Sequence, residues 1–159
     1  MKKLLSVICI LIVANLAKAQ QKRFLLDGEK LFKTEESKLI ESRLKSYYNK
    51  TKNYVAVVST DTLDIPETEF IIRFVTSSNL LIPEDRYGFV LLLSRKQQYI
   101  YLRGTESVDN YFTKDDYQKI LDAGKPDLVK KKTVDGVMKI CNAAMMKINS
   151  LPQKRPKVN

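Results

Sequence analysis

The sequence predicts an α/β protein, a three-layer αβα sandwich around a small mixed sheet. Residues 54–58 and 88–94 each contain an unbroken apolar run that is too short for a helix, so each is expected to be a strand buried on both faces. A helical pattern lies between them, which makes a parallel βαβ unit. Residues 98–103 follow a short polar connection and alternate, which predicts an antiparallel hairpin strand beside the second run.

The first nineteen residues have the three parts of a signal peptide. A basic start at Lys2 and Lys3 is followed by an apolar stretch, and Ala17-Lys-Ala19 fits a cleavage motif. An uncleaved anchor is the alternative, but the apolar stretch falls short of the ~20 residues that a spanning helix needs. We therefore expect residues 1–19 to be removed, residues 20–150 to form one domain and residues 151–159 to be a basic flexible tail. The product is expected to be exported without a transmembrane segment, either periplasmic or secreted.

Charge and residue types exclude several classes of chemistry. The chain has 28 Lys and Arg, 18 Asp and Glu and no His, which rules out Ser-His-Asp triads, Cys-His pairs and His-ligated zinc. Cleavage would remove three lysines and Cys9, leaving a net charge of +7 and Cys141 without a disulfide partner. The basic runs are short and carry no interleaved aromatic residues, so we expect attraction to anionic envelope surfaces and no nucleic-acid binding.

Four stretches carry helical patterns. The first is expected to start at Thr34 as N-cap and to end within residues 49–53, and the second covers residues 66–78 with Asp64 as its cap. A capping box from Thr113 to Asp116 opens the third, which Gly124 and Pro126 are expected to break. The last helix has an apolar stripe from Val134 to Ile148 that includes Cys141, so this thiol is expected in the core.

Short motifs follow one another in a set order over residues 24–148. They are Leu26-Asp27 with Leu31, Val55 to Val58, Asp85 to Leu93, Gly104-Thr-Glu106, Thr113 to Asp116, Pro126 to Leu128 and Gly136-Val137. This ordered set resembles the TPM-domain family, which includes thylakoid-lumen acid-phosphatase-like proteins and many exported bacterial proteins. The resemblance implies an α/β fold with an acidic site that binds calcium or acts as a phosphatase.

The expected topology brings several acids to one edge of the sheet. If residues 98–103 run antiparallel to the central strand, Gly104 lies beside Gly88, and Asp85, Glu106 and Asp109 meet there, with Asp116 near them. Carboxylates suit a hard cation such as Ca²⁺ or Mg²⁺, so these four residues are the candidate metal ligands. Acids beside helix starts are also common as caps or solvated charges, and Arg86 is placed to neutralise such a cluster.

The opposite edge offers an alternative. Asp61 and Asp64 follow the first parallel strand, where ligands of open α/β sheets usually bind, although Asp64 is better explained as a cap. The family resemblance favours the first edge. Asp27 matches the family's first acid but cannot be assigned to either edge from the sequence.

Two classes of function remain. The first is a non-enzymatic exported module that binds an envelope protein or surface and takes Ca²⁺ as a ligand. The alternative is a metal-assisted phosphatase-like hydrolase, which without His would have to use metal-bound water or a carboxylate. Arg86 and Tyr87 stand where the family usually has Asp-Asn-Gly, and Leu102 stands where it usually has glycine, which favours the binding module.

Overall fold

The computed structural model describes residues 22–80 and 86–152. The expected signal peptide, Asp85 and all but the first two residues of the expected tail lie outside these residues. Its elements are β1 (Leu25–Asp27), α2 (Thr34–Thr51), β2 (Tyr54–Ser59), α3 (Glu67–Ser77), β3 (Gly88–Ser94), β4 (Tyr99–Gly104), α4 (Glu106–Asp109), α5 (Lys114–Asp122), α6 (Lys125–Val129) and α7 (Thr133–Asn149).

The four strands form one mixed sheet in the order β1-β2-β3-β4. β2 and β3 are parallel, with Tyr54 opposite Gly88, and β4 runs antiparallel to β3, with Gly104 opposite Phe89. Both pairings confirm the sequence prediction. β1, which was not predicted as a strand, adds a third parallel strand beside β2.

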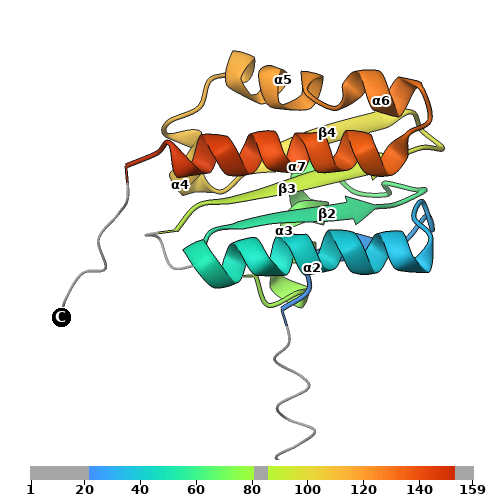
Figure 1. The fold of residues 1–159 in the computed structure, drawn as a ribbon, viewed down its shortest axis with the longest axis horizontal. Coiled ribbons are helices and arrows are strands. Elements are labelled where there is room, and N and C mark those ends of the chain that lie inside the picture. The colour runs from blue at the N-terminus through green and yellow to red at the C-terminus, as the bar shows by residue number, and fades with distance from the viewer. Residues whose placement is uncertain (1–21, 81–85, 153–159) are drawn as a thin grey trace, which may run out of the picture.

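Helices cover both faces of the sheet, so the predicted three layers are confirmed. In Figure 1, α2 and α7 lie in front of the sheet and α3 lies behind it. Helices α5 and α6 pack along α7. Within the described ranges 22–80 and 86–152, no helix is long and apolar enough to cross a membrane.

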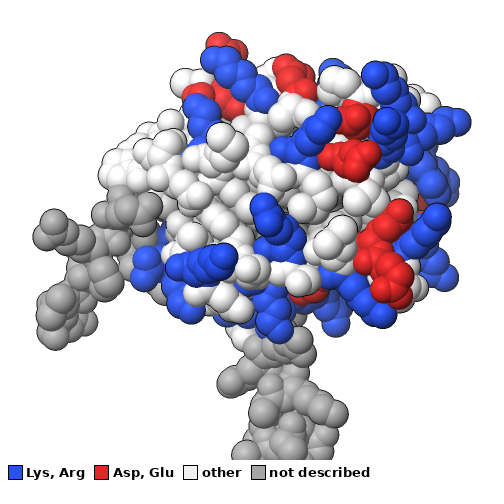
Figure 2. Space-filling view, in the orientation of Figure 1, with Lys and Arg blue, Asp and Glu red and all other residues white. Residues whose placement is uncertain are grey.

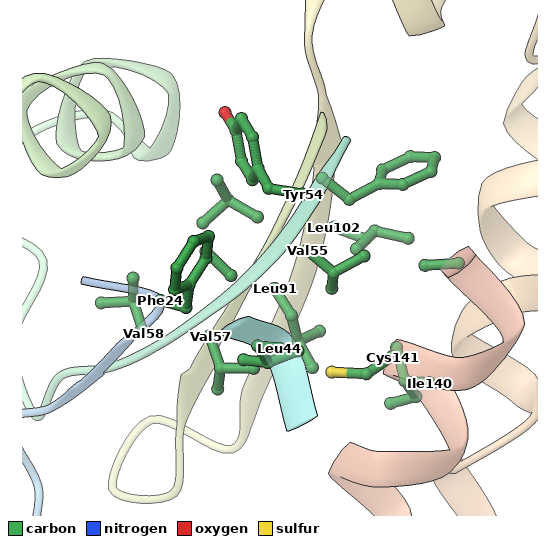
Figure 3. Packing of buried hydrophobic residues seen from close by; sticks show 14 of the residues in the cluster. Phe24, Leu44, Tyr54, Val55, Val57, Val58, Leu91, Leu102, Ile140 and Cys141 are labelled. Carbon is green, nitrogen blue, oxygen red and sulfur yellow. The ribbon is translucent and has the colours of Figure 1, made fainter. Parts of the chain in front are cut away.

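The core follows from strands with two covered faces. Every residue of β2 and β3 is buried. Figure 3 shows Val55 and Leu91 pointing to the side of α7, where Cys141 lies, whereas Tyr54 and Val58 point to the opposite side. Burial raises the pKa of the Cys141 thiol to about 12, so it is a neutral core residue, as the apolar stripe predicts.

Two predicted helix caps are wrong, and one short helix was not predicted. Thr34 is the first residue of α2, and the Glu36 carboxylate accepts from the Lys33 amide at 2.7 Å. Asp64 caps nothing, because Pro66 itself takes the N-cap position of α3. Helix α4 is the unpredicted one, since its four residues carry no periodic signal.

The C-terminal half agrees with the prediction in both its cap and its break. The Thr113 side chain accepts from the Asp116 amide, and the Asp116 side chain accepts from the Thr113 amide, which is the expected capping box. α5 and α6 are separate helices on either side of Ala123 and Gly124. A Cβ on Gly124 would lie 2.0 Å from the Gly136 carbonyl oxygen, so glycine permits the close approach of α7.

Candidate functional site

The two ends of the strands hold the polar side chains that sequence reasoning singled out. The Gly88 edge is the end at which β3 begins and β4 gives way to α4, and it includes the start of α5. The Ser94 edge is the opposite end, where β1, β2 and β3 finish at Asp27, Ser59 and Ser94.

At the Gly88 edge, Asp109 is held by a cation and a phenol. Arg103 Nη2 lies 2.9 Å from Asp109 Oδ2, and the Tyr117 hydroxyl donates to Asp109 Oδ1. The same hydroxyl accepts from the Gly104 amide at 3.2 Å. Burial, together with the neighbouring Asp109 charge, raises the pKa of Tyr117, so the phenol stays protonated as a donor. The carboxylate therefore joins β4, α4 and α5.

Asp116 has an equally complete set of partners. Its Oδ2 accepts from the Thr113 amide at 3.1 Å and the Thr113 hydroxyl at 2.9 Å, and Lys147 Nζ lies 2.9 Å from its Oδ1. The Lys147 hydrogen bond, followed by those from Thr113, holds the pKa of Asp116 well below its usual range. This carboxylate both caps α5 and ties it to α7.

Three of the four predicted metal ligands, Glu106, Asp109 and Asp116, lie within the described residues. Asp85 lies outside the described residues, and Glu106 is exposed on the first turn of α4 without a partner among them. The described ranges contain no group of three or more Asp, Glu, Cys or His residues placed to hold a metal ion. Asp109 and Asp116 would have to leave Arg103 and Lys147 to join one. The Ca²⁺ or Mg²⁺ site stays a prediction.

The Ser94 edge contains Asp27, which the sequence could not place. Its Oδ1 accepts from the Leu31 amide at 2.8 Å and from the Ser59 hydroxyl at 2.5 Å, and its Oδ2 accepts from the Phe32 amide at 3.0 Å. The pairing of Asp27 with Ser59 across β1 and β2 brings these groups together. Asp27 thus fixes the turn that leads from β1 to α2.

Glu29 makes a second set of bonds at this edge, which sequence reasoning missed. Its Oε1 accepts from the Ser94 hydroxyl at 3.1 Å and the Lys96 amide at 3.2 Å, and its Oε2 accepts from the Arg95 amide at 2.9 Å. The loop after β1 is thereby fastened to the turn between β3 and β4. Two successive backbone amides and a hydroxyl converge on one carboxylate.

An open hollow of about 520 Å³ lies beside this carboxylate. Gly28, Glu29, Lys30, Asp61, Arg95 and Lys96 line it. Lys30, Arg95 and Lys96 are exposed, and none forms an ion pair with another residue of the described part of the chain. Figure 2 shows Lys and Arg side chains gathered at the right-hand end of the molecule, where β3 turns into β4 in Figure 1. The rule that ligands bind at the carboxyl ends of parallel strands was the available signal for this edge.

Comparison with known families bears out the order of motifs. The sequence profile of the TPM domain matches residues 25–147, nearly the whole described fold. The chain belongs to the TPM domain family. No curated protein matches the sequence.

Solved structures support the same fold for this TPM domain. The BA42 protein of the psychrophilic bacterium Bizionia argentinensis is similar with a TM-score of 0.66 and 14% identity, over 82% of this chain and 91% of that one. The N-terminal domain of a protein from P. gingivalis is similar with a TM-score of 0.61 and 16% identity, over 84% of this chain and 88% of that one. The N-terminal domain of the cg2496 protein from Corynebacterium glutamicum is similar with a TM-score of 0.58 and 11% identity, over 82% of this chain and 83% of that one. At such identities the likeness concerns the fold alone.

Proposed function

We propose that this TPM domain is a non-enzymatic binding module of the cell envelope, exported by residues 1–19, with an envelope protein or surface as its partner. One observation carries the proposal: Asp27, Glu29, Asp109 and Asp116 all accept from donors of the chain itself. Catalysis by a carboxylate or by metal-bound water needs lone pairs that face substrate, water or metal. Here these lone pairs accept from donors of the chain itself.

Charge supports a binding role and indicates the nature of the partner. Removal of residues 1–19 leaves an excess of seven positive charges, since 25 basic residues then face 18 acidic ones. Cations without a local counter-charge attract anionic surfaces and accelerate encounter with them, an effect that weakens as salt is added. Anionic polymers and lipid headgroups of an envelope have the complementary charge.

Calcium enters the proposal as a modulator of binding. A Ca²⁺ or Mg²⁺ site at the Gly88 edge would use Asp85 and Glu106, and it would gain Asp109 and Asp116 only by breaking their bonds to Arg103 and Lys147. Oxygen ligands of this kind suit both cations. The cost of breaking two ion pairs makes the site weak, which fits an ion present at millimolar concentration outside cells.

The test compares binding with catalysis in the same preparation. Residues 20–159 are incubated with isolated cell envelopes and sedimented at low and at physiological salt, and hydrolysis of a phosphomonoester is assayed with Ca²⁺ and with Mg²⁺. We expect salt-sensitive sedimentation with envelopes and no turnover above buffer. Turnover that disappears in Glu106→Gln would overturn the proposal in favour of the phosphatase-like alternative, and failure to sediment at any salt would contradict the binding role.

Export is tested separately with the full chain. Bacterial cells producing it should contain an exported form that begins at Gln20, as determined by mass spectrometry of the N-terminus. Ala19→Asp should block cleavage, because the last position of the cleavage motif requires a small residue. An uncleaved wild-type chain recovered from the cytoplasm would contradict the localisation.

A further inference from the structure

We propose that the turn between β3 and β4 is a binding site for a phosphate-type oxyanion and that Glu29 is its internal occupant. The proposal rests on the binding function above and names the chemical class of the ligand. The donors are the Ser94 hydroxyl and the backbone amides of Arg95 and Lys96, all of which point at the Glu29 carboxylate.

The geometry of these donors suits an anion. The two successive amides lie 2.9 and 3.2 Å from Glu29 oxygens, and the Ser94 hydroxyl lies 3.1 Å from one of them. Successive backbone N–H groups aimed at one point make a concavity that binds anionic oxygens. Here the chain's own carboxylate demonstrates that the donor set takes an anion.

The surrounding charge exceeds what Glu29 can balance. Three cations, Lys30, Arg95 and Lys96, line the hollow together with two acids, Glu29 and Asp61. When Glu29 withdraws, three cations face one acid. A doubly charged oxyanion would restore the balance, whereas the carboxylate of Glu29 leaves one positive charge in excess.

Glu29 can leave without unfolding its loop, because another residue anchors that loop. Asp27 holds the Leu31 and Phe32 amides independently of Glu29. Glu29 itself is partly exposed beside the hollow of about 520 Å³. Rotation of its side chain therefore exposes the Ser94 hydroxyl and the Arg95 and Lys96 amides, while the turn into α2 is retained.

The number of acceptor oxygens favours phosphate over a second carboxylate. A carboxylate has two oxygens, and both oxygens of Glu29 already accept from the Ser94 hydroxyl or from the Arg95 and Lys96 amides. A phosphate group has enough oxygens to accept from the same donors and also from the Lys30, Arg95 or Lys96 side chains. An external carboxylate would only repeat the bonds that Glu29 already makes.

The decisive experiment is a titration with inorganic phosphate followed by amide NMR. Wild type, Glu29→Gln and the matched control Glu35→Gln are compared, since Glu35 is an exposed acid of α2 whose ion pair among the described residues is with Lys38. We expect phosphate to move the Arg95 and Lys96 amide signals and Glu29→Gln to tighten binding about ten-fold or more, because the competing anion is gone. Glu35→Gln should bind phosphate as wild type does.

A second variant keeps the proposal testable if Glu29→Gln fails to fold. The double variant Arg95→Glu, Lys96→Glu keeps Glu29 and changes only exposed side chains. We expect it to bind phosphate about ten-fold or more weakly than wild type. Glycerol phosphate and vesicles of phosphatidylglycerol in phosphatidylcholine then separate a free phosphate ester from a lipid headgroup. Whichever of the two competes with inorganic phosphate identifies the source.

Three results would overturn the oxyanion site. The first is that the Arg95 and Lys96 amide signals of a folded Glu29→Gln protein do not move at tens of millimolar phosphate. The second is that Glu35→Gln tightens phosphate binding as much as Glu29→Gln does. The third is that the double variant Arg95→Glu, Lys96→Glu binds phosphate as tightly as wild type. If the protein still sediments with envelopes after any of these results, the proposed binding function stands and only the oxyanion site is excluded. Phosphomonoester turnover would instead remove the binding function.

Discussion

The Gly88 edge and the Ser94 edge each hold two partly buried carboxylates, but they neutralise them by different means. At the Gly88 edge, Asp109 forms an ion pair with Arg103 and Asp116 forms one with Lys147, so each carboxylate is neutralised by one basic side chain. At the Ser94 edge, Asp27 and Glu29 accept from backbone amides and serine hydroxyls. Neither carboxylate forms an ion pair with a Lys or Arg within residues 22–80 and 86–152.

This difference decides which edge is available for an anion. Backbone amides carry no net charge, so capping a carboxylate with them leaves neighbouring cations free to attract other anions. Lys30, Arg95 and Lys96 are left in this way around the hollow. Ion pairing at the Gly88 edge has the opposite result, since Arg103 and Lys147 are engaged. The edge that the sequence singled out for a metal is therefore the more fully closed of the two.

The largest expected effect comes from the strand that separates the edges. Leu91 lies midway along β3, fully buried between Val57 and Leu102 on its neighbouring strands. We expect Leu91→Ala to lower the free energy of unfolding by about 2–5 kcal/mol, because covered faces cannot collapse around the cavity. Urea denaturation measures the loss, with exposed Leu39→Ala of α2 as the matched control. A loss below about 1 kcal/mol would contradict the central position of Leu91.

The next effect tests amide capping at the Ser94 edge. Asp27→Ala removes the acceptor for two backbone amides and the Ser59 hydroxyl, so we expect a loss of about 2–3 kcal/mol in the free energy of unfolding. Asp61→Ala is the control, because Asp61 is an exposed acid of the same edge and surface substitutions usually stay within about 0.5 kcal/mol. Equal losses from the two variants would show that Asp27 is no anchor.

Tyr117 provides the corresponding test at the Gly88 edge. Tyr117→Phe deprives Asp109 of a donor and the Gly104 amide of an acceptor, and we expect a loss of about 1–2 kcal/mol. Tyr101→Phe is the control, since the Tyr101 hydroxyl has no partner among the described residues. If both phenylalanine variants unfold at the same urea concentration, the hydroxyl of Tyr117 is not a structural link.

Local sequence patterns were sufficient to predict three of the four strands and most helices. Unbroken apolar runs identify β2 and β3, alternation identifies β4, and the Thr113 box identifies the start of α5. The cap assignments at Thr34 and Asp64 failed because several polar residues near a helix start are equivalent on sequence grounds. Only the backbone geometry decides among them. In α3 the N-cap position that was predicted for Asp64 belongs to Pro66.

Long-range partners were beyond sequence reasoning. Asp27 meets Ser59 only through the β1–β2 register, 32 residues away, and Glu29 meets Ser94 at a separation of 65 residues. The sequence pointed to Arg86 as the cation near the predicted acids. That stays a prediction. Among the described residues, Arg103 pairs with Asp109, and Lys147 reaches Asp116 from 31 residues further along the chain. Residue type suggested the chemistry of each edge, and topology decided the partners.

The Asp116–Lys147 pair at the Gly88 edge should make the stability of the fold depend on pH. The folded pKa of Asp116 lies below its unfolded value of about 3.9, so its stabilising effect is complete above that pH and is lost as the pH falls through the folded pKa. We expect Asp116→Asn to melt about 2–3 °C below wild type at pH 7, a modest shift for a largely solvent-screened pair. The gap should narrow as the pH is lowered from about 4 to 2 in parallel calorimetric scans. A gap that is constant over this range would exclude an ionic origin.

The smallest expected effect concerns the predicted metal at the Gly88 edge. Bound Ca²⁺ stabilises the folded state by mass action, so at millimolar concentration we expect the Tm of residues 20–159 to rise by about 1–2 °C, which corresponds to a weak site. Glu106→Gln should diminish the rise, because Glu106, unlike Asp109 and Asp116, has no partner for its carboxylate among the described residues. Arg103→Gln should enlarge it by releasing Asp109 from its ion pair. Each variant is compared with itself with and without the cation, so that its own change in stability cancels. If neither Ca²⁺ nor Mg²⁺ moves the Tm of wild type or Arg103→Gln, the acids of this edge serve only to join β4, α4, α5 and α7.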